Sequence, residues 1–383
     1  MQKRAVFAKK SDNRAQDLRE MRQTHTPKQN KRKAWLLALL IGVALIAVYG
    51  ITIAAGQPAF PVDLIWVTPA QKTVIIKEGQ GASQIARTLF TAHVINNEKT
   101  FMTYATQKNK QANIQPGAYR FEGVMTCEEV LDLIISGPNS DDGKLTVPEG
   151  MSVKETARLA HDHLGIDEQT FMSEASASKF IKAFPFLEGV NDDSLEGYLM
   201  GATYYFDPSD VTAHEVIERM LTKYQQSVKG IDMSAAIANI NRTYGLNLNS
   251  YDIIKVASIA EKEGVQDDDY PQITSVFYNR LRDGWNLCSD ATLAYALGRN
   301  VSADDLKQQN PYNTYLNSGL PPTPLCSPSL TCIKAALFPP ATDKFYFVLA
   351  EDKDVSIHAF SRTEQEHQKA VDELIAQRAA ATQ

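Results

Sequence analysis

The spacing of apolar residues divides this chain into two parts. Residues 35–55 form an uninterrupted apolar stretch that holds no charged side chain. About 20 such residues are what a helix needs to cross the hydrocarbon core of a bilayer. Beyond residue 70, apolar residues recur at alternate positions, as in strands, or at intervals of three and four, as in helices. The pattern therefore predicts one transmembrane helix at residues 35–55, followed by a folded α+β part.

Charge predicts the orientation of that helix. Before Trp35 the chain carries 11 Lys and Arg residues against three acidic ones, and the next basic residue is Lys72. Positive residues stay on the cytoplasmic side of a membrane. We therefore expect residues 1–34 to be a basic cytoplasmic segment of a single-pass inner (plasma) membrane protein whose bulk is periplasmic or otherwise extracytoplasmic. The alternative is a signal peptide cleaved near Ala55. The apolar region of a signal peptide is usually only about 7–15 residues long, however, and the 35–55 stretch is longer.

The exported residues form a linker followed by strands and helices. Three prolines mark residues 56–70 as the linker. A small α+β unit over residues 71–140 is predicted from strands at 74–76 and within 116–121 and helices at 83–90, 101–106 and 126–136. Ser83 and Thr126 are the expected N-caps of the first and third of these helices. A strand at 144–147 and a helix at 152–164 repeat its order of strand, Glu-Gly and helix, as a loose repeat or by coincidence. The rest is mainly helical, with helices at 212–228, 233–244, 252–263 and 363–380 and a strand at 345–349.

The cysteines and the net charge narrow the classes of protein. All four cysteines, Cys127, Cys288, Cys326 and Cys332, lie on the exported side, where disulfides are allowed. Four cysteines permit three pairings, of which a Cys326–Cys332 loop is the shortest, and Cys127 could equally be a buried apolar residue. No CxxC pair indicates zinc. The formal net charge of −6 gives no sign of nucleic-acid binding.

Two carboxylates end the apolar helix at 252–263 and are the first candidates for chemistry. At 100° per residue, Lys255, Ser258 and Lys262 share one face of this helix, and Glu261 and Glu263 fall on its two margins. A carboxyl at the edge of a dry surface stays protonated near neutral pH and suits a general acid. Spacing alone also allows both to be solvated acids at a helix end, so the choice between them stays open.

Other polar residues in apolar surroundings have two readings each. Asn279 and Arg280 interrupt an apolar run, where structural pairing is the default explanation. Asp290 has the position of a helix N-cap. The 311–322 loop, with its tyrosines, amides and prolines, suits a sugar or is an ordinary rigid turn. His358 and His367 match no compact metal-ligand pattern, and there is no phosphate loop or GxSxG elbow, so we expect no metal and no cofactor.

Taken together, these motifs resemble the endolytic murein transglycosylase (YceG-like) family. The matching strings are 194–199 (SLEGYL), 257–263 (ASIAEKE), 276–281 (VFYNRL), 311–315 (PYNTY), 319–322 (GLPP), 358–360 (HAF) with Thr363, and 366–367 (EH). Their order and spacing extend over about residues 70–375. The resemblance implies a membrane anchor, a LysM-like module at 71–140 and a YceG-like catalytic domain at 141–383. It also implies a peptidoglycan lytic transglycosylase that cuts nascent glycan strands, terminates their elongation and works beside cell-wall synthases, the penicillin-binding proteins.

The resemblance selects the catalytic acid that spacing leaves open. The family's glutamate matches Glu263, which would protonate the MurNAc–GlcNAc oxygen and then accept the proton of the MurNAc C6 hydroxyl as a 1,6-anhydro ring closes. Candidates for holding the glycan are Asn279, Arg280, Asp290, Tyr312, Asn313, Tyr315, Glu261, His358 and Glu366. The chain departs from the family at Gly264 (usually Thr), at Cys288-Ser289-Asp290-Ala291 (usually Gln-Thr-Asp-Pro) and at Met200-Gly201-Ala202 (usually Phe-Pro-Asp). The competing hypothesis is a non-catalytic, membrane-anchored peptidoglycan-binding scaffold for the synthases.

Overall fold

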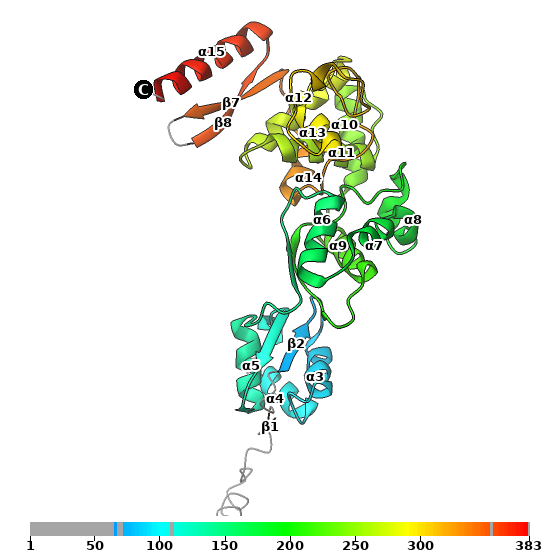
Figure 1. The fold of residues 1–383 in the computed structure, drawn as a ribbon, viewed down its shortest axis with the longest axis vertical. Coiled ribbons are helices and arrows are strands. Elements are labelled where there is room, and N and C mark those ends of the chain that lie inside the picture. The colour runs from blue at the N-terminus through cyan, green and yellow to red at the C-terminus, as the bar shows by residue number, and fades with distance from the viewer. Residues whose placement is uncertain (1–64, 67–71, 108–110, 353–354, 382–383) are drawn as a thin grey trace, which may run out of the picture.

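The computed structural model describes residues 65–66, 72–107, 111–352 and 355–381. The first described residues lie at one end of the long axis of the molecule and the C-terminal ones at the other (Figure 1). Every sheet in the described part has two antiparallel strands. The protein is therefore mainly helical α+β with small sheets, which confirms the predicted fold class at that level.

The predicted cytoplasmic segment and transmembrane helix, residues 1–34 and 35–55, lie outside the described residues. Among the helices that are described, none is both long and apolar enough to cross a bilayer. Most of the predicted linker also lies outside. Its residues 65–66 form the short strand β1 (Ile65–Trp66), which pairs with β4 (Val124–Met125).

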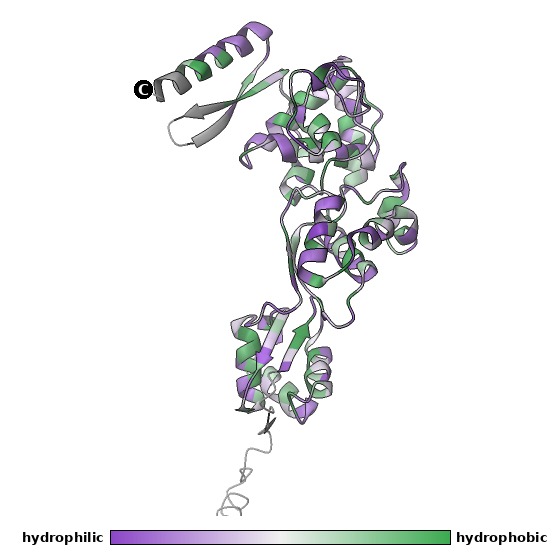
Figure 2. Ribbon diagram, in the orientation of Figure 1, coloured by the Kyte–Doolittle hydropathy of each residue, from purple (hydrophilic) through white to green (hydrophobic). Residues whose placement is uncertain are grey.

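The first unit packs three helices around one two-stranded antiparallel sheet. Strand β2 (Lys72–Ile76) pairs with β3 (Gly117–Phe121), and α3 (Ala82–Thr91), α4 (Glu98–Gln107), the 3-10 turn η1 (Gln111–Asn113) and α5 (Cys127–Ser136) surround the pair. Hydrophobic residues run along β2 and α5 (Figure 2), and Ile76, Leu89, Phe101 and Ile134 form a separate buried core. Thr126 caps α5 as predicted, but α3 begins at Ala82 because Gly81 rather than Ser83 holds its N-cap position.

A second strand, turn and helix follows in the same order. Strand β5 (Lys144–Val147) pairs with β6 (Ala202–Tyr205), and Ser152 caps α6 (Val153–Leu164). The two Glu-Gly turns share a left-handed glycine, with φ of +81° at Gly79 and +76° at Gly150. The predicted repetition of local structure is therefore present.

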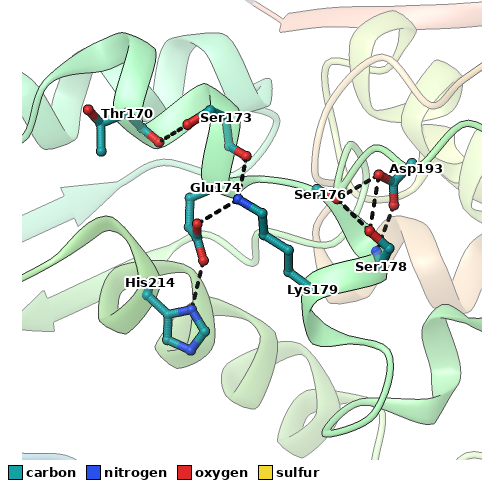
Figure 3. A network of polar contacts seen from close by, with 8 residues as sticks. All are labelled: Thr170, Ser173, Glu174, Ser176, Ser178, Lys179, Asp193 and His214. Atoms are coloured by element: carbon teal, nitrogen blue, oxygen red, sulfur yellow. Dashed lines mark hydrogen bonds and ion pairs between the residues drawn. The ribbon is translucent and has the colours of Figure 1, made fainter.

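Polar contacts join the next three helices, α7 (Glu168–Glu174), α8 (Ala177–Phe180) and α9 (Ala213–Ser227). Glu174 lies 2.7 Å from the Lys179 ammonium and 2.8 Å from the His214 ring, so one carboxylate links all three segments (Figure 3). Asp193 accepts a 2.6 Å hydrogen bond from the Ser178 backbone at the start of α8. The short turn η2 (Pro185–Gly189) follows α8.

The last helices surround α11 (Ser250–Glu263). They are α10 (Met233–Tyr244), α12 (Asp269–Arg282), α13 (Asp290–Leu297) and α14 (Leu330–Leu337), with the 3-10 turn η3 (Asp305–Lys307) between the last two. Most of the polar face expected on α11 is buried, because Ser258 is fully buried and Lys255 is 8% exposed, and only Lys262 in the last turn is exposed. The Ser258 hydroxyl donates to the Lys255 carbonyl and accepts from the Leu325 backbone. Packing on all sides of α11 thus overrides its amphipathic pattern.

A hairpin and a helix end the described chain. Strands β7 (Tyr346–Asp352) and β8 (Val355–Ser361) pair, and α15 (Glu364–Ala381) packs on them (Figure 1). Both predicted elements are present, and β7 continues three residues beyond the prediction. The hairpin also contacts α12 and so brings His358 to the end of α11.

The cysteines do not form the disulfide that spacing suggested. Cys326 and Cys332 are buried free thiols, and Cys288 is an exposed free thiol. Cys326 Sγ instead lies 3.6 Å from the Ser258 carbonyl oxygen. Cys127 is fully buried in the core of the first unit, as the apolar reading of this residue predicted.

Candidate active site

Glu263 is the last residue of α11. The helix stops there because Gly264 takes an extended conformation while its N–H still bonds the Ala260 carbonyl at 2.9 Å. The carboxyl is largely withdrawn from water, and this burial raises its pKa above the ordinary value for glutamate. Nearby Asp290 raises the pKa further, whereas the Ser289 hydroxyl, the Ala291 N–H and His358 oppose the rise. The result is a carboxyl that holds its proton at higher pH than a solvated glutamate.

Ser289 is the direct partner of this carboxyl. Its hydroxyl donates to Glu263 Oε1, and its side chain is buried at the start of α13. Ser289, not Asp290, holds the N-cap position of α13, so the predicted cap is displaced by one residue. The usual family residue at 289 is Thr, so the hydroxyl is kept despite the changed motif. The sequence signal was a hydroxyl residue directly before a helix, which spacing alone does not connect to Glu263.

Asp290 and Tyr315 lie on the same side of the site. The Tyr315 hydroxyl donates to Asp290 Oδ1 at 2.8 Å. Asp290 is exposed at the first residue of α13, and both residues are close enough to Glu263 to interact with it electrostatically. Of the nine predicted glycan-binding residues, these two combine proximity to Glu263 with polar atoms at the surface.

Asp269 and His358 form a buried pair, and His358 is close enough to Glu263 to interact with it electrostatically. His358 Nδ1 lies 2.9 Å from Asp269 Oδ2, with side chains 4% and 8% exposed. Burial alone would raise the pKa of Asp269, but His358 and the N–H groups of Val265 and Gln266 together lower it. The Asp269 carboxylate thus holds both the turn after Glu263 and the hairpin strand that carries His358. Sequence reasoning did not single out Asp269.

Arg280 and Asn279 use their donors on backbone carbonyls. The Arg280 guanidinium donates to the carbonyls of Phe345, at 2.7 Å, and Leu287. Asn279 is fully buried and donates to the carbonyls of Thr342 and Lys344 at 3.0 and 2.9 Å. Both residues fasten the segment before β7 to α12. Arg280 is also near Glu263, and burial lowers its pKa below the usual arginine value.

The remaining predicted residues are also tied to the fold. Glu261 accepts the Ser329 N–H at 2.8 Å beside the start of α14, and Glu366 accepts the Arg362 N–H at 2.8 Å before α15. Asn313 is buried and donates to two carbonyls of the 306–308 turn, and the Tyr312 hydroxyl lies 2.9 Å from Thr323 Oγ1. Neither Glu261 nor Glu263 is fully solvated, so the reading of both as solvated acids is wrong. Whether these residues touch a glycan stays a prediction.

Gly264 has a packing reason for being glycine. A Cβ at this position would lie 2.3 Å from Cε1 of the Tyr270 ring. Real Cβ contacts are not that short, so the usual threonine would need Tyr270 to move. The Tyr270 ring therefore occupies the space that a side chain at position 264 would need, and Ser289 supplies a hydroxyl to Glu263 from another part of the chain.

The fold and this site define a mainly helical α+β protein with one acid of raised pKa at the end of a buried helix. Within the part of the chain that the structure describes, no group of three or more His, Cys, Asp or Glu side chains is arranged to hold a metal ion.

Comparison with known proteins gives the family. The model of the YceG-like family matches residues 74–373, and the chain belongs to this family. An endolytic murein transglycosylase of Bacillus subtilis (strain 168) is 30% identical over 315 residues, covering 78% of this chain and 84% of the relative. One from Streptococcus pneumoniae serotype 2 is 28% identical over 90% of this chain, which spans 65% of that longer relative. A crystal structure of a YceG-like protein from Listeria monocytogenes aligns with a TM-score of 0.51 and 29% identity, covering 79% of this chain and 99% of the other.

Proposed function

We propose that this protein is an endolytic peptidoglycan lytic transglycosylase, a carbon–oxygen lyase acting on the glycan strands, with Glu263 as its acid and base. The observation that carries the proposal is the Glu263 carboxyl, which is withdrawn from water, has a raised pKa and receives the Ser289 hydroxyl. Family membership and relatives named endolytic murein transglycosylases support it.

The reaction needs only one carboxyl. Protonated Glu263 donates its proton to the oxygen between MurNAc C1 and GlcNAc, and the C1–O bond breaks. The MurNAc C6 oxygen then bonds to C1 and closes a 1,6-anhydro ring, and its proton returns to Glu263. No water is consumed and the carboxyl is restored. Hydrolytic glycosidases generally use a second carboxylate, whereas the attacking oxygen here belongs to the substrate.

The product tests the proposal. Incubation of the full-length chain with peptidoglycan is expected to release muropeptides with 1,6-anhydro-MurNAc ends, identified by mass. Reducing ends would instead indicate a hydrolase. A protein that binds sacculi and releases nothing would fit the scaffold hypothesis.

The Ser289 hydroxyl gives a pH prediction. A hydrogen bond to the ionised form lowers the pKa of a carboxyl, so Ser289→Ala is expected to raise the pKa of Glu263 further. The general acid then stays protonated to higher pH, and the alkaline limb of the plot of kcat against pH moves to higher pH. Ser289→Thr keeps the hydroxyl and is the matched control, expected to leave that limb in place. An unshifted limb in Ser289→Ala would separate Ser289 from the titration of the acid.

We propose that the chain works at the outer side of the inner membrane. Residues 35–55 would anchor it, residues 71–140 would serve as a LysM-like module, and cell-wall synthases would be neighbours on nascent strands. The basic segment before Trp35 and the apolar stretch after it support this topology. A reporter enzyme that is active only outside the cytoplasm, fused after residue 60, is expected to be active. The same reporter fused after residue 30 is expected to be silent, and the reverse pattern would contradict the orientation.

A further inference from the structure

Glu196 is a buried carboxyl that the reaction above does not use. It is 3% exposed, although it belongs to a motif that the family resemblance includes. The Val153 N–H, at the start of α6, lies 3.1 and 3.2 Å from its two oxygens. The Tyr295 hydroxyl of α13 donates to Oε2 at 3.0 Å, and the Gly197 N–H is a further donor. A carboxylate at a helix start satisfies otherwise unpaired N–H groups.

The loop that carries Glu196 also fits tightly against the helix that carries Glu263. Gly197 has a φ of +95°, and a Cβ there would lie 2.5 Å from Ile254 of α11 and 2.9 Å from Pro324. The loop position is therefore fixed by backbone packing. From this position Glu196 reaches α13, whose N-cap residue Ser289 donates to Glu263.

We propose that Glu196 is a positioning residue: through Tyr295 it holds α13 so that Ser289 meets the Glu263 carboxyl. This inference rests on the proposed function. The carboxyl contacts α13 some distance along the helix from Ser289, so its effect on the reaction is indirect. A shift of this helix would move Ser289 and Asp290 together relative to the acid.

Glu196 titrates in the physiological range. Burial raises its pKa to about 7 against its hydrogen bonds, and Glu155 of α6 adds to the rise. The other titratable groups that interact with it are Tyr295 of α13, Tyr312 of the 311–315 loop and Cys326. The ionised carboxylate accepts from Tyr295, whereas protonation turns one oxygen into a donor. The neutral carboxyl can still accept, but a hydrogen bond to the ionised form is stronger, so the contact with α13 strengthens as pH rises through about 7.

The contribution of Glu196 to folding stability changes with pH in the opposite direction to the α13 contact. The folded-state pKa of about 7 lies above 4.5, the ordinary pKa of glutamate. The stability that neutral Glu196 contributes is therefore present below the unfolded pKa and is lost as pH rises through the folded pKa. A positioning role predicts that kcat rises over the range in which this contribution to stability falls. A purely structural role predicts that the two fall together.

The test is a double-mutant cycle on the full-length chain. Glu196→Gln is expected to lower kcat for anhydro-end formation about 10- to 100-fold, as small misplacements do, with KM changed less, and to flatten the acidic limb of the kcat profile. Tyr295→Phe is expected to give a smaller kcat loss, and the double variant to lose no more than Glu196→Gln. Glu188→Gln and Tyr205→Phe, at an exposed and a partly exposed position, are the matched controls.

The outcomes separate this inference from the proposed function. If wild type and Glu263→Gln release equal amounts, the proposed function fails and this inference fails with it. If only Glu263→Gln is inactive while Glu196→Gln and Tyr295→Phe keep wild-type kcat and pH profile, Glu196 has no positioning role. If Glu196→Gln does not fold, Tyr295→Phe alone decides: unchanged kcat overturns the proposal and a lowered kcat with unchanged KM supports it.

Discussion

Glu263→Gln is expected to lower the rate of strand cleavage about 10²- to 10⁴-fold, the range that general acid–base catalysis contributes. The amide is nearly the same size and still accepts a hydrogen bond from Ser289, so the fold is expected to persist. It cannot give a proton to the glycosidic oxygen or take one from the C6 hydroxyl. Release of anhydro-ended muropeptides over time measures the effect, with circular dichroism as the check on folding.

Glu261→Gln is the matched control because it changes the same group two residues away. Its carboxyl accepts the Ser329 N–H, a bond that the glutamine oxygen also forms. The glutamine also keeps a polar group for the predicted contact of residue 261 with the glycan, so cleavage is expected to stay within a few-fold of wild type. If Glu261→Gln were inactive and Glu263→Gln active, the assignment of the acid would be reversed.

Asp269→Ala is expected to lower the free energy of unfolding by about 3 kcal/mol, because buried donors that lose their acceptor cost about 1–3 kcal/mol each. The substitution removes the acceptor of two N–H groups after α11 and the partner of His358 at once. Urea unfolding of the full chain measures the change.

A surface acid at the other end of the same helix is the control for Asp269. Asp283 pairs with Arg282 at 2.7 Å, but both side chains are 39% exposed. Exposed pairs contribute about 0–1 kcal/mol, so Asp283→Ala is expected to change stability by no more than that. Equal losses in the two variants would show that the buried Asp269–His358 pair contributes no more to the free energy of unfolding than an exposed pair.

The pH dependence of Asp269 has a definite sign. Its folded-state pKa is lowered, so its contribution to stability is present above the unfolded pKa and is lost as pH falls through the folded value. Part of the acid-induced loss of stability of wild type is therefore expected to be missing in Asp269→Ala. This direction is opposite to that of Glu196, which allows the two groups to be told apart.

Local structure could be predicted from the sequence where a single short segment determines it. Thr126 caps its helix as predicted, because its side chain accepts a hydrogen bond from the backbone N–H three residues on, and Ser152 begins the predicted 152–164 helix in the same way. The burial of Ser258 and Lys255 could not be predicted, since it depends on how α10, α12, α13 and α14 pack around α11, which no local pattern specifies.

At the candidate site, too, the sequence predicted what local spacing determines but not which groups the fold brings together. Spacing left Glu261 and Glu263 equivalent, and only the family resemblance selected Glu263. Structure distinguishes them by their partners: a helix-start N–H for Glu261, and the Ser289 hydroxyl for Glu263. Asn279 and Asn313 had polar groups suited to sugars, yet their amides bond backbone carbonyls that no sequence pattern predicts.

The most direct test of the central claim is the mass of the new glycan ends. Peptidoglycan digested by the wild type is predicted to give 1,6-anhydro-MurNAc ends, and Glu263→Gln to form them about 10²- to 10⁴-fold more slowly. Reducing MurNAc ends, or equal release by both proteins, would contradict a lytic transglycosylase that uses Glu263 as its acid and base.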